Sequence, residues 1–204
     1  MASRCTPFHV KHVTIKPSQQ EKLLAFGGLL HTYNQRINLV SRRTTKSGIT
    51  AHIQECLAFV SVQFPSGASL TDWGTGGGLP AIPIAIMRPD VTIHAVDSVQ
   101  KKILAIRSFK RELDLPNLLP WHGRAELFSE MVNYSVSRAT TRLVRLWQWH
   151  SRVATQNGAL YCMKGGDISE ERSALEMSYP TVEVKQIPIP ETQKMLLQVK
   201  QVLM

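Results

Sequence analysis

Two helices are predicted for the first third of the chain, because apolar residues there recur at steps of three and four. Ser18 and Glu21 stand at the spacing of a capping box, which predicts a helix start at this point. The apolar face behind it comprises Leu23, Phe26, Leu30, Tyr33 and Ile37. A second helical face comprises Ile49, Ile53, Cys56, Leu57 and Val60, and the segment Phe64-Pro65-Ser66-Gly67 ends it. We expect residues 1–67 to form an N-terminal helical extension and not a separate domain.

From Ala68 onward, short β-type runs alternate with helical ones. The predicted strands are Ser69–Trp73, Thr92–Asp97, Leu118–His122, Asn133–Ser137, Gly158–Lys164, Thr181–Pro188 and Lys194–Leu203. The predicted helices are Ala81–Met87, Gln100–Leu113, Thr141–Val153 and Glu170–Met177. This alternation predicts a mostly parallel α/β sheet covered on both faces, and the last two strands leave room only for an antiparallel hairpin at one end. Residues 68–204 therefore have the element order of a class I methyltransferase, a Rossmann-like, seven-stranded domain with one reversed strand.

A glycine-rich segment between the first predicted strand and the next helix indicates a ligand site. It reads Asp72-Trp73-Gly74-Thr75-Gly76-Gly77-Gly78-Leu79-Pro80 and lies at the carboxyl edge of the predicted sheet, where nucleotides bind in such folds. A dinucleotide fingerprint needs a glycine where Leu79 stands. The spacing of Asp72, Gly74, Gly76 and Gly78 is instead that of methyltransferase motif I, and the acid suits a sulfonium ligand with an amino group. A glycine-rich turn without a ligand stays open as an alternative.

Two further segments are expected at the same edge. Asp97 ends the second predicted strand, where an acid can accept both ribose hydroxyls of an adenosine or cap the helix that begins at Gln100. The third strand is followed by Gly123-Arg124-Ala125-Glu126. In methyltransferases an equivalent turn holds the adenine through a backbone N–H and an acid, although by itself the turn indicates only another helix start.

The composition favours a polyanionic partner and argues against zinc-binding, disulfide-rich, secreted and membrane-spanning proteins. Lys and Arg outnumber Asp and Glu by 24 to 15, and the net charge of +9 favours a polyanionic partner. Cys5, Cys56 and Cys162 show no CxxC spacing, which argues against a zinc site or a disulfide framework. Residues 1–14 lack the apolar stretch of a signal peptide, and no apolar run approaches the roughly 20 residues of a membrane span. These features predict a cytoplasmic protein without a metal.

The matching motifs are spread over most of the chain and resemble one family, the ribosomal RNA small-subunit methyltransferase G family, or glucose-inhibited division protein B. They are Tyr33-Asn34-Gln35-Arg36-Ile37-Asn38-Leu39, His52-Ile53, Asp72 through Pro83 with its Leu-Pro-x-Ile-Pro tail, Asp97-Ser98 with Lys101-Lys102, Gly123-Arg124-Ala125-Glu126, Ser137-Arg138-Ala139 and Lys164-Gly165-Gly166. Each is weak alone, but together they are specific. The resemblance implies transfer of a methyl group from S-adenosyl-L-methionine to guanine N7 in the 16S rRNA of the 30S ribosomal subunit.

The resemblance also implies site residues. It places Gly74, Leu79, Ala125, Glu126 and Arg138 on the family's cofactor-binding positions, in addition to the motif I residues and Asp97. Two departures stand out. The family's His-Ile-x-Asp-Ser appears here as His52-Ile53-Gln54-Glu55-Cys56, and its Phe-Asp before the Ser-Arg motif appears as Val132-Asn133. We interpret Asn133 as the loss of an acid near the cleft.

No acid or base residue is expected to take part in the chemistry. Guanine N7 has no proton to lose, so catalysis should rest on positioning the two reactants. The sequence also lacks the Asn-Pro-Pro-aromatic tetrad of amine methyltransferases and the Pro-Cys turn of cytosine C5 enzymes. Arg138 is expected to meet cofactor or substrate, and Lys164 the guanine or a phosphate. A surface ion pair is the alternative for Arg138, and a purely structural role for Lys164.

Basic residues after the first helix are candidates for contact with the RNA backbone. Arg42 and Arg43 are the main ones, with a wider set of Arg36, Lys46, Lys11, Lys16, Arg107, Lys110 and Arg111. Ordinary solvated surface is the alternative for each. Trp147, Trp149 and His150 are expected to pack in the core rather than stack on bases. We expect a monomer. A nucleotide-dependent oxidoreductase is disfavoured by the glycine spacing, whereas an RNA-binding assembly factor that retains the pocket without transfer stays open.

Overall fold

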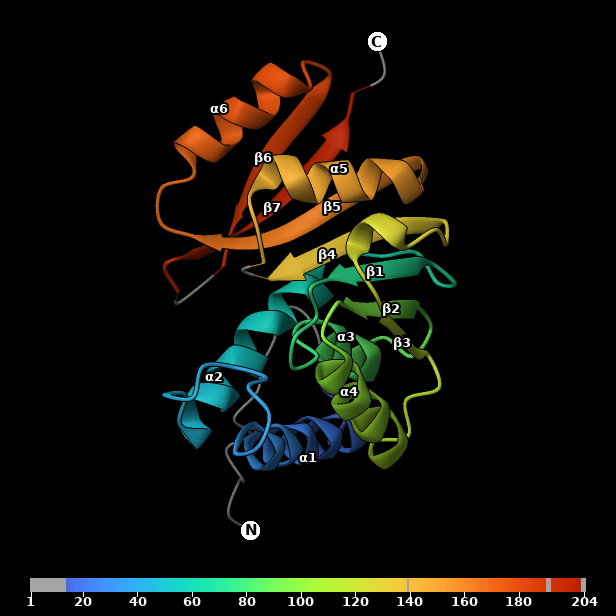
Figure 1. The fold of residues 1–204 in the computed structure, drawn as a ribbon, viewed down its shortest axis with the longest axis vertical. Coiled ribbons are helices and arrows are strands. Elements are labelled where there is room, and N and C mark those ends of the chain that lie inside the picture. The colour runs from blue at the N-terminus through green and yellow to red at the C-terminus, as the bar shows by residue number, and fades with distance from the viewer. Residues whose placement is uncertain (1–13, 139, 190–191, 203–204) are drawn as a thin grey trace.

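The computed structural model describes residues 14–138, 140–189 and 192–202. A seven-stranded sheet forms the centre, and helices lie on both of its faces (Figure 1). Cys5, Lys11 and Ala139, which the sequence analysis singled out, lie outside the described residues.

The order of the strands in the sheet is β3-β2-β1-β4-β5-β7-β6. Their bounds are β1 Ser69–Trp73, β2 Thr92–Asp97, β3 Leu118–His122, β4 Val132–Arg138, β5 Ala154–Gly165, β6 Val182–Pro188 and β7 Lys194–Gln201. Strand β7 runs antiparallel to β5 and β6, and the other neighbouring pairs are parallel. The class I fold, including the reversed strand and the final hairpin, is therefore confirmed. The largest difference is in β5, which begins at Ala154, directly after the preceding helix.

The connections between the strands are short helices, as predicted. They are α3 (Ala81–Met87), α4 (Gln100–Glu112), α5 (Leu143–Val153) and α6 (Ser169–Ser178), with a short 3-10 turn, η2 (Ala125–Leu127), between β3 and β4. Before the sheet come α1 (Pro17–Asn34), α2 (Lys46–Cys56) and a 3-10 turn, η1 (Leu57–Ser61). The capping box predicted at Ser18 is wrong. Helix α1 begins at Pro17, which lacks the N–H that a first turn leaves unpaired, and Gln19 Oε1 accepts the N–H of Lys16 at 2.9 Å.

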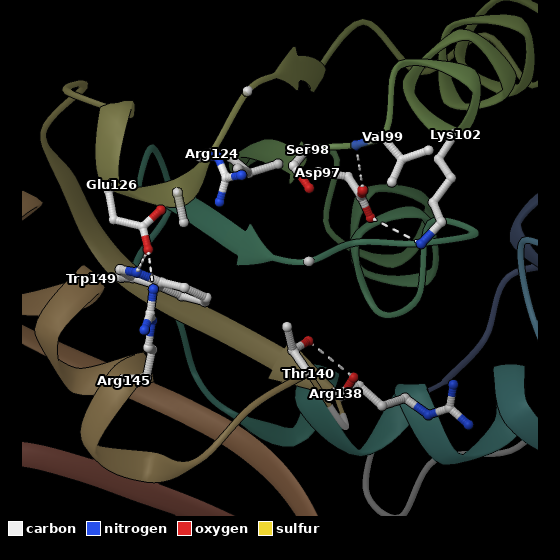
Figure 2. Close-up of a pocket in the computed structure, with 14 residues that line it drawn as sticks. Asp97, Ser98, Val99, Lys102, Arg124, Glu126, Arg138, Thr140, Arg145 and Trp149 are labelled. Atoms are coloured by element: carbon white, nitrogen blue, oxygen red, sulfur yellow. Dashed lines mark hydrogen bonds and ion pairs between the residues drawn. The ribbon is translucent and has the colours of Figure 1, made fainter.

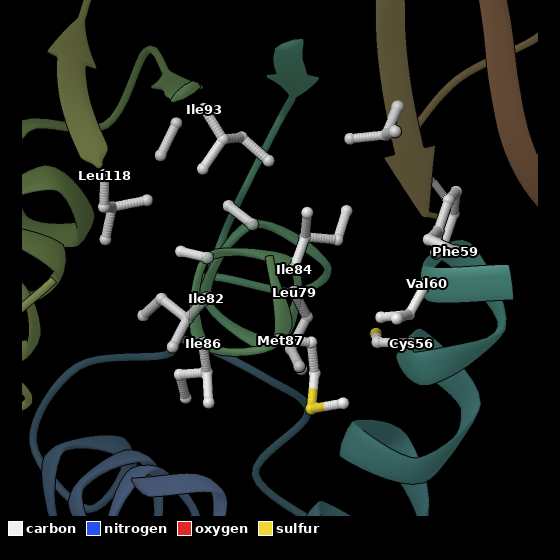
Figure 3. Packing of buried hydrophobic residues seen from close by; sticks show 14 of the residues in the cluster. Cys56, Phe59, Val60, Leu79, Ile82, Ile84, Ile86, Met87, Ile93 and Leu118 are labelled. Atoms are coloured by element: carbon white, nitrogen blue, oxygen red, sulfur yellow. The ribbon is translucent and has the colours of Figure 1, made fainter. Parts of the chain in front are cut away.

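Two hydrophobic clusters hold the layers together. The first joins Phe26 of α1 and Ile53 of α2 to Ile82 of α3 and to one face of the sheet. Figure 3 shows part of it, with Cys56 of α2 and Val60 of η1 facing Met87 of α3. The second packs α5 and α6, with Trp147 among its members, on the other face. The N-terminal helices thus share one core with the sheet, and burial of this apolar surface stabilises both together.

Two predicted core residues of α5 are confirmed. Trp147 is 4% exposed and His150 is 1% exposed. The Nδ1 atom of His150 lies 2.9 Å from Ser135 Oγ, and burial lowers the pKa of the imidazole to about 4. His150 is therefore an uncharged core residue near neutral pH.

Asn133 lies at the opposite edge of the sheet from the one expected. Its Oδ1 atom accepts the N–H of Ser69, the first residue of β1, at 2.8 Å. Because β1 and β4 are parallel, their first residues share the amino edge, whereas ligand sites lie at the carboxyl edge. The interpretation of Asn133 as a lost acid near the cleft is wrong. In the part of the chain described, no helix is long and apolar enough to cross a membrane.

Candidate active site

A cavity of about 520 Å3 opens at the carboxyl edge of the sheet (Figure 2). The residues that follow β1, β2, β3 and β4 border it, and side chains from α4 and α5 complete its wall. They are Gly74, Val96, Asp97, Ser98, Val99, Lys102, Gly123, Arg124, Ala125, Glu126, Arg138, Thr140, Arg145 and Trp149. Its size and mixed lining are those of a small-molecule site in a doubly wound fold.

Asp97 places a carboxylate in the wall of this cavity, beside Val99 and Lys102 (Figure 2). Its Oδ2 atom accepts the N–H of Gly76 at 3.0 Å, and its Oδ1 atom accepts the N–H of Val99 at 2.9 Å. Lys102 Nζ lies 3.6 Å from Oδ2. The carboxylate therefore orders the turn before α4 and does not cap the helix, whose N-cap is Val99. The role toward ribose hydroxyls stays a prediction.

The glycine loop meets the cavity at one point. Gly74 borders it with a φ of 69°, and a Cβ there would collide with the side chain of Thr140. The other side of the loop packs on the protein, since a Cβ at Gly77 would lie 2.8 Å from Leu30 and 3.3 Å from Leu39. Gly76, Gly78 and Leu79, which were predicted to bind the cofactor, do not border the cavity. They hold the loop against its neighbours.

Asp72 lies behind the loop and is fully buried. Its Oδ2 atom accepts the N–H of Ala81 at the start of α3, at 3.2 Å. Burial raises the pKa of the Asp72 carboxyl to about 7; the hydrogen bond from Ala81 opposes the rise, and the charge of Asp97 adds to it. Asp72 does not border the cavity either, so its visible contact is with the loop and helix that shape the site.

An aromatic and charged wall closes the end of the cavity formed by η2. Glu126 Oε1 accepts hydrogen bonds from Arg145 Nη2 at 2.7 Å and from Trp149 Nε1 at 3.1 Å. The guanidinium of Arg145 lies 5.7 Å from the centre of the Trp149 ring. The prediction that Trp149 packs in the core is confirmed in part, because its half-buried ring lies 5.9 Å from that of Trp73 and packs against the second cluster. The side chain also borders the cavity and orients the carboxylate of Glu126 (Figure 2).

The opposite end of the cavity is formed by the end of β4. Thr140 Oγ1 donates to the carbonyl of Trp73 at 2.9 Å, which joins this end to β1. Arg138 borders the cavity, but its guanidinium points toward α2 (Figure 2). There its Nη2 atom lies 2.8 Å from His52 Nδ1 and 3.4 Å from Glu55 Oε2.

Arg42 and Arg43 are exposed in the connection between α1 and α2. Asn34, a buried residue of the predicted aromatic-Asn signature, shapes this connection. Its Oδ1 atom accepts the N–H groups of Leu39 at 2.9 Å and of Val40 at 3.0 Å. The two arginines therefore sit on an ordered connection whose inner side touches the glycine loop.

Lys164 is placed differently from the prediction. Its Nζ atom donates to the carbonyl of Thr141 at 2.6 Å and to both carboxylate oxygens of Glu171, at 3.1 and 2.9 Å. These contacts use the donors of the ammonium group. Glu171 also accepts the N–H of Leu143 at the start of α5, at 2.8 Å, so Lys164 links α5 to α6 in this structure.

Comparison with known proteins decides the family. The family model described as rRNA small subunit methyltransferase G matches residues 19–200. The chain belongs to this family. The ribosomal RNA small subunit methyltransferase G of Salinibacter ruber is 43% identical over 181 residues, which cover 84% of this chain and 84% of the relative. That of Chlorobium phaeobacteroides is 36% identical over 197 residues, covering 93% and 88%.

Solved structures confirm the fold of this chain. A SAM dependent methyltransferase from Aquifex aeolicus has a TM-score of 0.59 at 14% identity and covers 72% of this chain and 89% of its own. A ribosomal protein L11 methylase from Lactobacillus delbrueckii has a TM-score of 0.62 at 9% identity, with coverage of 76% and 80%. At these identities the likeness establishes the class I fold alone.

The cavity brings together some of the predicted residues and adds others. Of the predicted cofactor positions, those bordering the cavity are Gly74, Asp97, Ala125, Glu126 and Arg138. Lys102, Thr140, Arg145 and Trp149 were not assigned to the site, although they border it. Arg145 and Trp149 are four residues apart on one helix, a spacing that places them on the same face.

Proposed function

We propose that this chain transfers the methyl group of S-adenosyl-L-methionine to N7 of a guanine in 16S rRNA. Its family membership makes it a methyltransferase that uses this cofactor. The observation that carries the proposal is the cavity at the carboxyl edge of a class I sheet, whose wall contains Asp97 and, at one end, the Ala125–Glu126 turn.

The residues present fit the cofactor. The cavity offers about 520 Å3, a buried carboxylate and an aromatic wall, which suit an adenosine group. In the proposed arrangement Asp97 accepts the ribose hydroxyls, and Glu126 with the backbone of Ala125 holds the adenine. The methionine part then extends past Gly74 toward the end of β4, so the reacting end lies beside Thr140 and Arg138.

The chemistry asks little of the protein beyond placement. The bound cofactor supplies a methyl group on a sulfonium, and guanine N7 supplies a lone pair without losing a proton. The carboxylates that border the cavity, Asp97 and Glu126, are both held by hydrogen bonds at some distance from the end of β4. We therefore assign no acid or base and propose that positioning provides the rate enhancement.

We propose that the RNA backbone is bound by the exposed basic connection between α1 and α2, which carries Arg36, Arg42 and Arg43, together with Lys46 at the start of α2. The attraction is electrostatic and releases counterions from the RNA. As further parts of the proposal, the chain acts in the cytoplasm as a monomer without a metal ion.

Labelled S-adenosylmethionine incubated with the protein and either 30S subunits or bare 16S rRNA tests this function. We expect label on one guanine, at a position sensitive to the strand cleavage typical of N7-methylated guanine. Asp97→Asn should remove most of the activity, and Glu183→Gln, which changes an exposed ion pair with Lys200, should not. RNA binding without transfer would favour an assembly factor that retains the pocket.

A further inference from the structure

A carboxylate outside the cavity joins three parts of the chain that are far apart in sequence. Glu55 on α2 accepts a hydrogen bond from Lys194 Nζ at the start of β7, at 2.6 Å, and one from Arg138 Nη2 at the end of β4, at 3.4 Å. The side chains of Glu55 and Arg138 are 17% and 14% exposed. Burial raises the pKa of Glu55, but the hydrogen bond from Lys194 and the charges of Lys194 and Arg138 outweigh it and hold the pKa at about 2. Glu55 is therefore charged throughout the working pH range.

His52 completes the arrangement around Arg138. A guanidinium can only donate, so the Nδ1 atom of His52, 2.8 Å from Arg138 Nη2, is the acceptor. His52 and Glu55 of α2 thus hold the guanidinium of Arg138, a residue that borders the cavity. In Figure 2 the Arg138 guanidinium accordingly points away from the cavity and toward α2.

The pairing of charges around the cavity makes Glu55 distinctive. Lys102 and Arg145 are paired with Asp97 and Glu126, which border the cavity themselves. Arg138 instead depends on a carboxylate supplied by α2. Without that carboxylate, Arg138 at the end of β4 and Lys194 at the start of β7 would be two uncompensated cations next to the reacting end of the proposed arrangement.

We propose that Glu55 is a positioning residue for methyl transfer: it holds the Arg138 guanidinium out of the reacting end of the cavity and offsets the charges of Arg138 and Lys194, so that this end accepts a cationic sulfonium. The inference rests on the proposed use of S-adenosylmethionine.

The two forms of the cofactor provide a direct readout. S-adenosylmethionine carries a positive sulfonium, and S-adenosylhomocysteine has the same parts with a neutral sulfur. An uncompensated charge at roughly 8 Å in partly solvated protein changes the affinity for a cation by about threefold to thirtyfold. Glu55→Gln should therefore raise the ratio of the two dissociation constants, methionine form over homocysteine form, by that factor at low salt. A purely structural role would weaken both ligands alike.

Isothermal titration of the full chain with both ligands tests the proposal. Glu55→Asp keeps the charge and should leave the ratio within about twofold of wild type, whereas Lys194→Met removes a cation and should lower the ratio. Glu183→Gln is the matched control, since it removes a carboxylate from an exposed pair with Lys200 on the neighbouring strand. An unchanged ratio in Glu55→Gln overturns the proposal, and if that variant does not fold, an unchanged or raised ratio in Lys194→Met does so. Wild-type protein that binds neither ligand would contradict the proposed cofactor instead.

Discussion

Asp72 is expected to destabilise the folded chain as the pH rises, because its carboxyl is buried with a pKa of about 7 against an ordinary value of 3.8. A folded pKa above the unfolded one means that the folded state holds a proton that the unfolded state releases. The stability associated with this proton is complete below the unfolded pKa and is lost as the pH rises through 7. The difference of about three pKa units corresponds to a loss of about 4 kcal/mol once both states are ionised.

Asp72→Asn isolates this effect. The amide has the size of the carboxyl and keeps an oxygen that can accept the N–H of Ala81, but it carries no charge. The ionisation cost in wild type rises from about 2 kcal/mol at pH 5.5 to about 4 kcal/mol at pH 8.5. The free energy of unfolding of the variant, relative to wild type, should therefore increase by about 2 kcal/mol over this range.

Urea unfolding at the two pH values measures this difference. Asp90→Asn is the control, since Asp90 pairs with Arg88 at 2.7 Å and the pKa of its carboxyl is lowered. The difference in unfolding free energy between this variant and wild type should therefore not grow with pH. If the unfolding free energy of Asp72→Asn relative to wild type stays constant or falls as the pH rises, the Asp72 carboxyl is readily ionised in the folded state. If this acid also serves the amino group of the cofactor, the variant should bind S-adenosylhomocysteine more weakly although it is more stable.

Three other predictions follow from the described geometry. His150 has a pKa of about 4, so the stability it contributes is present above its ordinary value of 6.5 and is lost toward acid. Relative to His150→Gln, wild type should lose about 2 kcal/mol of unfolding free energy between pH 7.5 and 5. Gly74→Ala should weaken S-adenosylhomocysteine binding about tenfold or more in titration calorimetry, because its φ is positive and the new Cβ collides across the loop, whereas Gly28→Ala, in open space, should not. Arg42→Ala with Arg43→Ala should reduce the dependence of RNA affinity on salt; an unchanged slope would make these arginines ordinary surface.

The elements of the fold were predictable because each depends on local periodicity. The change at Ala68 from steps of three and four to alternating strands and helices was visible in the sequence, and the strand Ser69–Trp73 was placed correctly. Position along a strand was harder to interpret. Asn133 was assigned to the cleft because it stands near the Ser137-Arg138 motif, but four residues of strand span about 13 Å and lead to the opposite edge.

The candidate site could be predicted only where its residues follow a strand directly. Asp97 and Gly74 border the cavity because parallel strands end together, which is a rule of the fold. Trp149 and His150 are adjacent, yet a turn of about 100° per helical residue sends one to the cavity and the other to the core. The pairing of Glu55 with Lys194 joins residues 139 positions apart, and nothing local in the sequence indicates it.

The contact of Gly77 with Leu30 and Leu39 limits how the chain can be divided. In a truncated protein beginning at Ala68, the back of the glycine loop would face water, because the loop would lose the residues of α1 and of the following connection on which it packs. An attempt to redirect the enzyme to another RNA by exchanging its first 67 residues with those of a relative meets the same constraint. The exchanged segment must present a surface that fits Gly76 and Gly77, so the two segments have to be inherited as a matched pair.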